Sequence, residues 1–432
     1  MKGLFLAVGV VVFSAVLPLT PVFSQEEIAA PGTLNLNDLI QQALEKNAEI
    51  AAAKAEWLAA KKRILASWAL PDPVGGYDIM GSMVETATGP QKNRFMVSQE
   101  VPFPAKLLEK RKAAKAEANG IYARYRALEL DITNKLSRLY YQLYYIDASL
   151  DTLAEVKDLL KKIEGVAQAR YSGMTGTQRD VAKAEAEFSV NLEKLYTLQQ
   201  QRESVAAQMN ALLDQDPMNS IGKATFPAKP VLKNTLVELV NLAVQNRQAI
   251  KEAEAMVSKT HYSKRLAQLA YLPDVNVGFE YTRVGKDMAD NDGRNTWMFP
   301  LRFNIPLWQN RIIPEIQEAQ KLEEAQKAKL IAAKNQTFFE VKDAYYRFES
   351  SGKIADLYDA AIIPQAKIAL SADQAGYEAG KTDFLNLLDS ERVYLNAKLS
   401  QVQFYTESLK AYADLSWATG LDLQSPEKES PK

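Results

Sequence analysis

The chain has 432 residues, of which 47% are hydrophobic and 24% are charged, with 52 Lys and Arg against 53 Asp and Glu. The formal net charge of -1 argues against a nucleic-acid-binding protein, because such a protein usually carries a basic stripe. The absence of cysteine excludes disulfides and thiolate metal sites.

Residues 1–24 have the pattern of a secretory signal peptide. Lys2 precedes an apolar run over residues 4–16, Pro18 and Pro21 follow, and cleavage is expected after Ser24. The run is too short for a comfortable membrane span, and an N-terminal anchor helix is the alternative. Because no later segment offers a long unbroken apolar run, the mature protein should either be soluble after export or enter a membrane as β-strands.

Residues 25–216 are predicted to form a first unit of helix, strand pair and long helical hairpin. Asn37 or Asp38 is expected to cap a first helix that runs to about Ser67. Prolines then stop this helix, and a strand pair is predicted near residues 77–101.

The helix predicted over residues 105–170 determines the shape of the molecule. Its apolar residues recur at alternating spacings of four and three, which is the seam of a coiled coil: Ile132, Leu136, Leu139, Leu143, Ile146, Leu150, Leu153 and Leu160. Roughly 65 helical residues extend on the order of 100 Å, so this helix cannot fold back into one globular core. A turn with small residues near 171–177 leads into a return helix.

A linker over residues 217–234 separates this unit from a second one at residues 235–420. The second unit contains a strand pair near 275–305 and a hairpin tip near 377–383. A polar tail covers residues 421–432.

The two units are related in sequence. Residues 239–250 match residues 39–50 at an offset of 200. The segments that begin at Tyr171 and Tyr377 match at an offset of 206. A match of this length, with the same order of elements, predicts an internal two-fold repeat.

The predicted strands alternate in side-chain character. In the second unit five large apolar residues alternate with polar ones, and we predict that they face lipid: Trp297, Phe299, Leu301, Phe303 and Ile305. Runs of about ten residues span a bilayer when tilted. A soluble sandwich is the alternative, but four strands in two separate hairpins are too few for one. A membrane sheet cannot leave its edges open, so several copies of the chain would have to close one barrel.

Catalysis is not indicated by the sequence. There is no glycine-rich phosphate loop, no His-Glu-x-x-His motif and no serine elbow. His261 is the only histidine, and a lone histidine on a helix is more often a packing or surface residue than a ligand. We therefore expect no enzyme, no cofactor and no metal site. A soluble exported coiled-coil protein is a further alternative, but it would leave the apolar strand face without a partner.

Along essentially the whole mature chain, the sequence resembles the TolC family of outer-membrane efflux ducts. The resemblance rests on the order of elements and on the tip phrases YSGMTG at residues 171–176 and YEAGKT at residues 377–382. It implies a mainly α-helical fold with a membrane β-barrel portion. In a homotrimer, each protomer would give four strands to a twelve-stranded barrel, continued by an α-barrel of long antiparallel coiled coils. Such a protein lies in the outer membrane of a Gram-negative bacterium and extends into the periplasm.

The same resemblance implies a passive exit duct for small solutes in a tripartite efflux system. Its partners would be further copies of itself, a periplasmic adaptor (a membrane fusion protein), an inner-membrane pump and outer-membrane lipid, with no nucleic acid. Residues 98–104 look closer to the heavy-metal efflux branch than to the multidrug or protein-secreting branches, so heavy-metal cations are a candidate cargo. A duct for type I protein secretion is the alternative with the same fold.

The family pattern also implies site residues. Two aspartates that narrow the periplasmic aperture map to Asn386 and Asp389, and Asp180 holds the equivalent position in the first unit. A ring of such acids, one set from each copy, would select cations. A closing latch of tyrosine and arginine maps to Tyr377 and Thr382, so the arginine is absent at that position. The residues expected to dock onto the adaptor are Gly173, Met174, Thr175, Gly380, Lys381 and Thr382.

Overall fold

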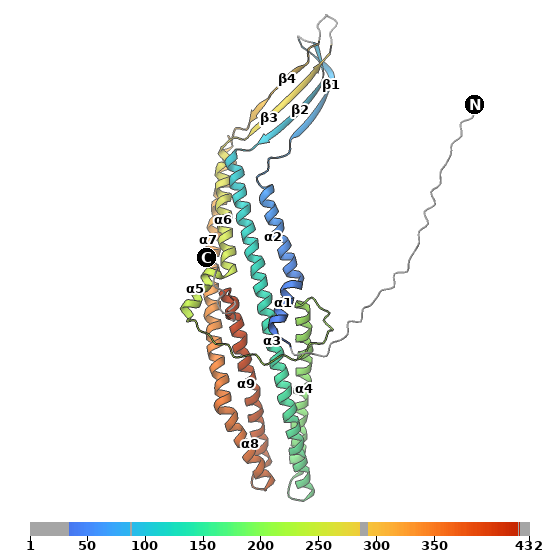
Figure 1. Ribbon diagram of the computed structural model, residues 1–432, viewed down its shortest axis with the longest axis vertical. Coiled ribbons are helices and arrows are strands. Elements are labelled where there is room, and N and C mark those ends of the chain that lie inside the picture. Colours follow the sequence, from blue (N-terminus) through green and yellow to red (C-terminus); the bar gives the residue numbers. More distant parts are fainter. Residues whose placement is uncertain (1–33, 87–88, 286–292, 422, 424–432) are drawn as a thin grey trace, which may run out of the picture.

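The computed structural model describes residues 34–86, 89–285, 293–421 and 423, and it shows an elongated molecule (Figure 1). The first half comprises α1 (Leu36–Lys46), α2 (Ala48–Ala66), β1 (Val74–Thr86), β2 (Gly89–Val101), α3 (Pro104–Ser172) and α4 (Gln178–Leu212). The second half comprises α5 (Leu236–Asn246), α6 (Gln248–Gln268), the 3-10 turn η1 (Leu269–Tyr271), β3 (Val275–Val284), β4 (Thr296–Met298), β5 (Leu301–Phe303), α7 (Gln309–Leu357), the π-helical turn η2 (Tyr358–Ile362), α8 (Ile363–Glu378) and α9 (Phe384–Thr419). The predicted signal peptide at residues 1–24 lies outside the described residues, as does the tail beyond residue 423.

The sheet forms one end of the molecule, and the tips of two helical hairpins form the other (Figure 1). Its strands are antiparallel in the order β1-β2-β3-β4, and β5 also pairs with β3. β2 pairs with β3 from Gln91 and Val284 to Val101 and Val275. The two strand pairs, which are distant in sequence, therefore belong to one sheet.

The last strand, predicted as one run over residues 296–305, is two short strands. β4 and β5 are separated by Phe299 and Pro300, because a proline has no N–H to donate to the ladder. The Pro300 carbonyl still accepts a hydrogen bond of 2.9 Å from the Gly278 N–H. A side chain at Gly278 would collide with this proline, since a Cβ there would lie 2.9 Å from Pro300 Cγ.

The single helix predicted up to Ser67 was also wrong, because the chain breaks at Asn47 between α1 and α2. Asn47 has φ -60° and ψ 125°, and its side-chain oxygen accepts hydrogen bonds from the N–H groups of Glu49 and Ile50. An asparagine side chain can thus end one helix and start the next without proline or glycine. α5 and α6 break at Arg247 with nearly the same backbone angles, φ -60° and ψ 120°, but without a side-chain cap.

The first turn of α1 is capped by Asn35, not by Asn37 or Asp38 as predicted. The Asn35 side chain accepts a hydrogen bond of 3.1 Å from the Asn37 N–H. Asp38 instead lies within the first turn, where its negative charge interacts favourably with the positive end of the helix dipole.

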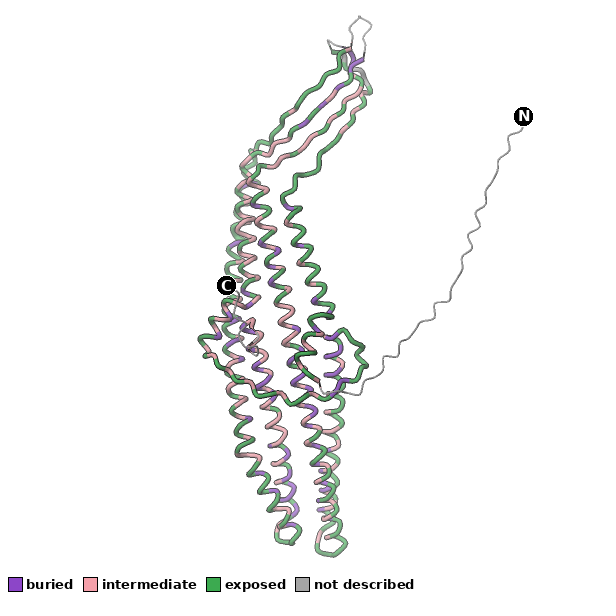
Figure 2. The backbone as a smooth tube through the Cα atoms, viewed as in Figure 1, coloured by how far each residue is buried: buried purple, intermediate pink, exposed green. Residues whose placement is uncertain are grey.

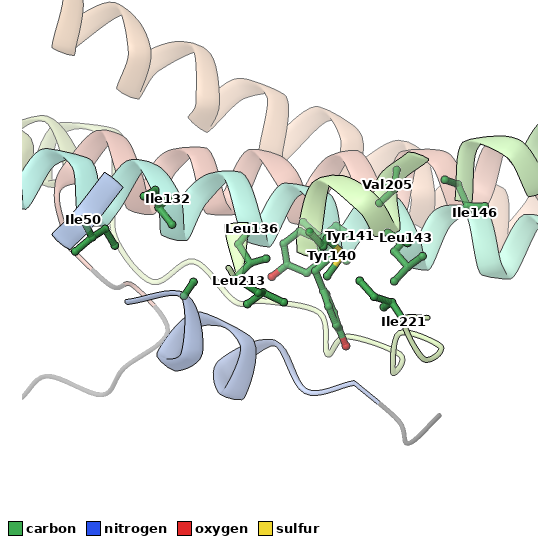
Figure 3. Packing of buried hydrophobic residues seen from close by; sticks show 14 residues of the cluster. Ile50, Ile132, Leu136, Tyr140, Tyr141, Leu143, Ile146, Val205, Leu213 and Ile221 are labelled. Carbon is green, nitrogen blue, oxygen red and sulfur yellow. The ribbon is translucent and has the colours of Figure 1, made fainter. Parts of the chain in front are cut away.

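The seam of α3 is the centre of the main core. Ile132, Leu136, Leu143 and Ile146 are 0% exposed. They pack with side chains from α1, α2, α4 and α9 (Figure 3), among them Ala43, Ile50, Val205, Met209 and Leu409. Burial of each such side chain contributes about 1.5–3 kcal/mol. Most of the sheet remains exposed or half-buried (Figure 2). Within the described part of the chain, no helix is both long enough and apolar enough to cross a membrane.

Residues 214–234, which we call the belt, cross the molecule at mid-height between α4 and α5 (Figure 1). The buried Asp147 of α3 fixes the belt: its carboxylate accepts hydrogen bonds from Arg202 Nε at 2.8 Å and from the Ala224 N–H at 3.3 Å. On the other side, the Tyr405 hydroxyl of α9 donates to the Pro227 carbonyl at 2.7 Å. The belt is thereby attached to helices from both halves of the chain.

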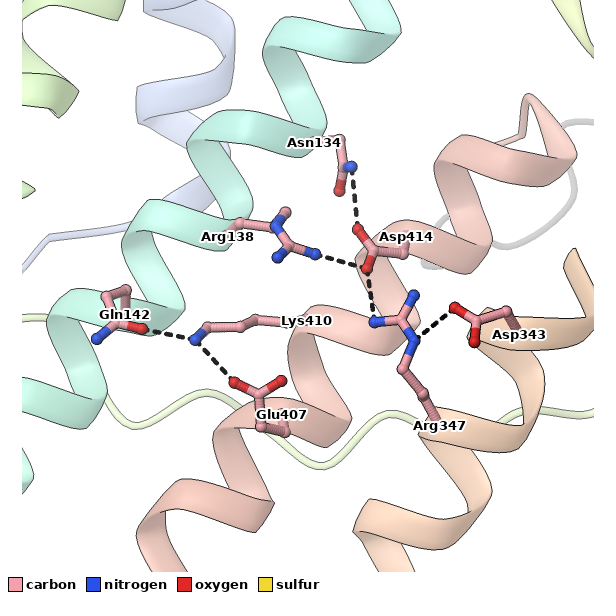
Figure 4. A network of polar contacts seen from close by, with 8 residues as sticks. All are labelled: Asn134, Arg138, Gln142, Asp343, Arg347, Glu407, Lys410 and Asp414. Atoms are coloured by element: carbon pink, nitrogen blue, oxygen red, sulfur yellow. Dashed lines mark hydrogen bonds and ion pairs between the residues drawn. The ribbon is translucent and has the colours of Figure 1, made fainter. Parts of the chain in front are cut away.

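Polar contacts join α3, α7 and α9 at about the same level (Figure 4). Asp414 of α9 accepts hydrogen bonds from Arg138 of α3 at 2.6 Å and from Arg347 of α7 at 3.1 Å. Lys410 of α9 donates to Gln142 of α3 at 2.6 Å. α9 therefore makes polar contacts with both α3 and α7, the two longest helices.

The π-helical turn η2 interrupts the path from α7 to α8. The Ile363 N–H donates to the Tyr358 carbonyl five residues earlier, instead of four. Pro364 follows directly and has no N–H, so the regular pattern cannot continue through it. α3 runs through 69 residues without such an interruption.

Candidate functional site at the helical tips

The first hairpin tip is a rigid, exposed turn. The N–H groups of Thr175 and Gly176 both donate to the Arg170 carbonyl at 2.9 Å, which closes the end of α3. Thr177 and Asp180 then form a capping box at the start of α4. Met174, inside the turn that the Arg170 carbonyl closes, is 95% exposed and has a positive φ of 60°.

The second tip is built the same way. The N–H groups of Lys381 and Thr382 donate to the Gly376 carbonyl at 2.8 Å and 3.2 Å. Gly380 takes the left-handed conformation with φ 72°. Gly376 must be a glycine, because a Cβ there would lie 2.1 Å from Thr382 Oγ1. Both tips therefore expose a fixed backbone surface.

Arg170 connects the two tips. Its guanidinium carbon lies 4.6 Å from the ring centroid of Tyr377, on the other hairpin. The same group donates hydrogen bonds to the Tyr377 carbonyl and, at 3.2 Å, to the Thr175 carbonyl. Sequence reasoning missed Arg170 because it sought an arginine at the position of Thr382. The sequence feature that could have identified it is the position of Arg170 directly before the first tip phrase at residues 171–176.

Tyr377 and Asp180 lie close together inside the tip region. The Tyr377 side chain is 3% exposed, and its hydroxyl has no hydrogen-bond partner among the described residues. Burial, with a smaller effect of the Asp180 charge, raises the pKa of Tyr377. Asp180 is 8% exposed and its carboxylate accepts from the Thr177 N–H.

Asn386 and Asp389 do not join this pair. Both side chains are exposed on α9. The predicted aperture residues thus separate into a buried pair, Asp180 and Tyr377, and an exposed pair. Tyr377 packs in a cluster that also contains Phe384, Leu387, Leu388, Leu370, Ile163, Ala167 and Ala184.

The sheet has one apolar and one polar face. The five residues predicted to face lipid are 62–67% exposed in the protomer, and Phe299 packs against Trp297 and Phe279. On the polar face Glu280 is 6% exposed and accepts from Arg302 at 2.7 Å. Arg94 lies 3.9 Å from the same carboxylate. Glu280 is therefore paired with two cations.

His261 is part of an ion-pair cluster. Its Nδ1 lies 3.5 Å from the buried carboxylate of Glu323, which also contacts Lys264 at 2.5 Å and Lys327 at 2.9 Å. The two lysines lower the pKa of Glu323 to about 2. Among the described residues, histidines and acids form no group of three or more that could hold a metal ion.

We expect Arg170→Ala to loosen the contact between the tips. Loss of the ring contact and of the hydrogen bonds should cost about 1–2 kcal/mol, so the amides of residues 377–382 should exchange hydrogen about five- to thirtyfold faster. Hydrogen exchange followed by mass spectrometry on the full-length protein measures this. Tyr377→Phe is the matched control: it removes only an unpartnered hydroxyl and should keep the wild-type rate. Equal rates in Arg170→Ala and wild type would contradict the role of Arg170.

The chain can now be compared with known proteins. The family described as outer membrane efflux protein matches residues 239–421. The outer-membrane channel OprN matches with a TM-score of 0.79 and 18% identity, over 90% of this chain and 91% of that chain. VceC from Vibrio cholerae has a TM-score of 0.77 and 19% identity, over 90% and 97%. CusC has a TM-score of 0.77 and 16% identity, over 94% and 98%.

Comparison with curated proteins gave no match. The fold nevertheless extends over nearly the whole length of each solved structure named above. The chain therefore has the fold of outer-membrane channels, and its second half matches the outer membrane efflux protein family.

Proposed function

We propose that the protein is a passive exit duct in the outer membrane of a Gram-negative bacterium. The observation that carries this proposal is the sheet: its apolar face is open, while its polar face holds a neutralised charge cluster. An apolar face with so many exposed large side chains must be covered by apolar surroundings. The fold shared with outer-membrane channels supports lipid as those surroundings. The duct performs no chemistry, and its direction is set by the pump it joins.

The open edges of the sheet support an assembly of several copies. β1 pairs only with β2, and β4 and β5 pair only with β3, within the strands that the structure describes. Unpaired backbone groups are costly in lipid, so each edge must pair with another chain. The TolC-family resemblance implies three copies and a barrel of twelve strands.

We also infer that the two halves of the chain are copies of one unit. Asn47 and Arg247 break their helices with nearly the same backbone angles. At the tips, Arg170 and Gly376 each accept two N–H groups through one carbonyl. Two matched halves give each protomer two helical hairpins and two strand pairs.

The cargo is proposed to be small solutes. Heavy-metal cations remain a hypothesis, since CusC matches no better than OprN or VceC in fold. Protein export through the same duct is the alternative. In each case the inner-membrane pump would select the cargo.

The first test is the state of the protein in the membrane. We expect detergent to be needed for extraction, and a particle mass of three times that of the mature chain. Analytical ultracentrifugation with matched detergent density measures the mass. A soluble monomer in the periplasm would refute the shared barrel and favour the exported coiled-coil alternative.

The tips are the proposed docking surface for the adaptor. Gly173, Met174, Thr175, Gly380 and Lys381 are exposed, and Thr382 is half-buried. We expect the double variant Met174→Glu, Lys381→Glu to abolish efflux in cells, since it removes the Lys381 cation and adds two carboxylates to an exposed surface. Its particle mass should not change. Lys329→Glu, on an exposed position of α7, is the control and should keep efflux. Undiminished efflux in the double variant would refute the docking assignment.

The proposed aperture depends on Asp389 more than on Asp180, because Asp389 is exposed and Asp180 already caps α4. We expect Asp389→Asn to weaken block of single channels by a trivalent cation on the order of tenfold, through loss of one charge per protomer. Conductance in planar bilayers measures the block. Asp359→Asn, which is exposed at η2, should leave it unchanged. If block persists after both Asp389 and Asp180 are neutralised, the aperture lies elsewhere.

A further inference from the structure

Glu391 of α9 is a buried acid without a partner. It is 1% exposed, and neither carboxylate oxygen has a hydrogen-bond partner among the described residues. Its position is three residues after Leu388 and four before Leu395, both of which are buried. Glu391 therefore occupies a position of the α9 seam at which an apolar residue would be expected.

The side chains of α4 that act on Glu391 or lie close by along the helix are also polar. Glu187 is 8% exposed and pairs with Arg392, the neighbour of Glu391. Asn191, one helical turn after Glu187, is 2% exposed, and both its amide atoms lack partners in the described structure. The charged groups that act on Glu391 are Glu187 and Lys194 from α4 and Arg392 from α9.

Among the described residues, α3 and α8 contribute no cation that acts on Glu391. On α8, Asp373 accepts a hydrogen bond from Ser390, next to Glu391. On α3, Leu160 and Ile163 are buried and apolar, and Glu155 is engaged by Lys398 at 2.7 Å. The cation that is nearest in sequence, Arg392, is held by Glu187.

An ionised carboxylate in this setting is unfavourable. Burial removes the charged group from the water that would solvate it, and Glu187 adds a second negative charge nearby. These two causes raise the pKa of Glu391 from 4.5 to about 7. When α9 separates from α4, water reaches the carboxylate and its pKa returns towards the ordinary value.

We propose that Glu391 is a proton-dependent fastener that holds the α8–α9 hairpin against α4 when neutral and loosens it when ionised. A neutral carboxylic acid can donate a hydrogen bond and carries no charge to desolvate, whereas the ionised group can only accept. Loss of its proton to solvent leaves two adjacent carboxylates, with Arg392 held by Glu187, and with Lys194 of α4 as the other cation. If the protein is the duct proposed above, a rise in pH favours opening of its tips.

The direction of the pH effect follows from linkage. The packed state binds the Glu391 proton more tightly than the separated state does, so packing is strongest below about pH 4.5. It weakens as the pH rises from about 4.5 to about 7, and the effect is complete above that range. Within the range, the local opening equilibrium should increase by up to about tenfold per pH unit.

Hydrogen exchange of the full-length protein in detergent, between pH 5 and pH 8, tests the fastener. After division by the intrinsic exchange rate, opening of residues 384–395 should increase as the pH rises to about 7 and then level off. Glu391→Gln, which stays neutral, should remove this dependence. Glu391→Leu completes the apolar seam and should give strong, pH-independent protection, which keeps the test valid if the amide variant does not assemble. Glu185→Gln, an exposed acid of α4, should keep the wild-type dependence.

Two results would overturn the proposal: flat protection in the wild type, or an unchanged slope in Glu391→Gln. Single-channel recording separates the fastener from the duct. Open probability that rises with pH in wild type, but not in Glu391→Gln, supports both. Absence of conductance at every pH, together with the expected exchange pattern, refutes the duct and supports the fastener.

Discussion

The apolar seam of α3 is the interaction on which the rest of the structure depends. It continues from the main core into the tip region, where Leu153, Val156 and Leu160 pack with Leu395 of α9. α2, α4, α6 and α9 all lie against this one helix. A single continuous helix can provide such a surface only because its side chains keep the coiled-coil spacing over many turns. The belt and the polar ties to α7 then fix the remaining helices relative to it.

Buried acids divide into two groups by their partners. Asp147, Glu280 and Glu323 each have an arginine or lysine within ion-pair distance, and each joins elements that are distant in sequence. Such pairs hold elements in register, since removal of one partner leaves a buried charge. Glu391 forms no ion pair with a described residue, and Glu187 adds a competing negative charge. Buried carboxylates in this fold thus act as permanent ion-pair partners at three positions and, in our proposal, as a titratable group at Glu391.

Much of the architecture could be predicted from sequence because its signals are long. The seam of α3 and the alternation of residues 275–284 extend over enough positions to fix helix or strand type. The errors fall where one residue overrides a pattern. Asn47 breaks a helix through its side chain, and Pro300 divides a strand through a missing donor. The π-helical turn before Pro364 has the same origin.

The site was harder to predict because its contacts join the two halves of the chain. The tip phrases located both turns, but the partner of Tyr377 comes from Arg170, which is 207 residues away. No local spacing relates these two positions. Likewise, the gap in the α9 seam between Leu388 and Leu395 was visible, but the meaning of Glu391 depends on Glu187 of another helix.

The belt also has a mechanical consequence. It is the covalent link between the two halves, and Arg202 of α4 donates hydrogen bonds to its Ile221 and Gly222 carbonyls. From Arg202 to the start of α4 at Gln178 the helix spans 24 residues, or about 36 Å. A rotation of about 5° at the belt would displace the end of such an arm by about 3 Å on this length scale. Small rearrangements at mid-height are thus enlarged at the tips, where the packing between the two hairpins and the contact of Arg170 resist them.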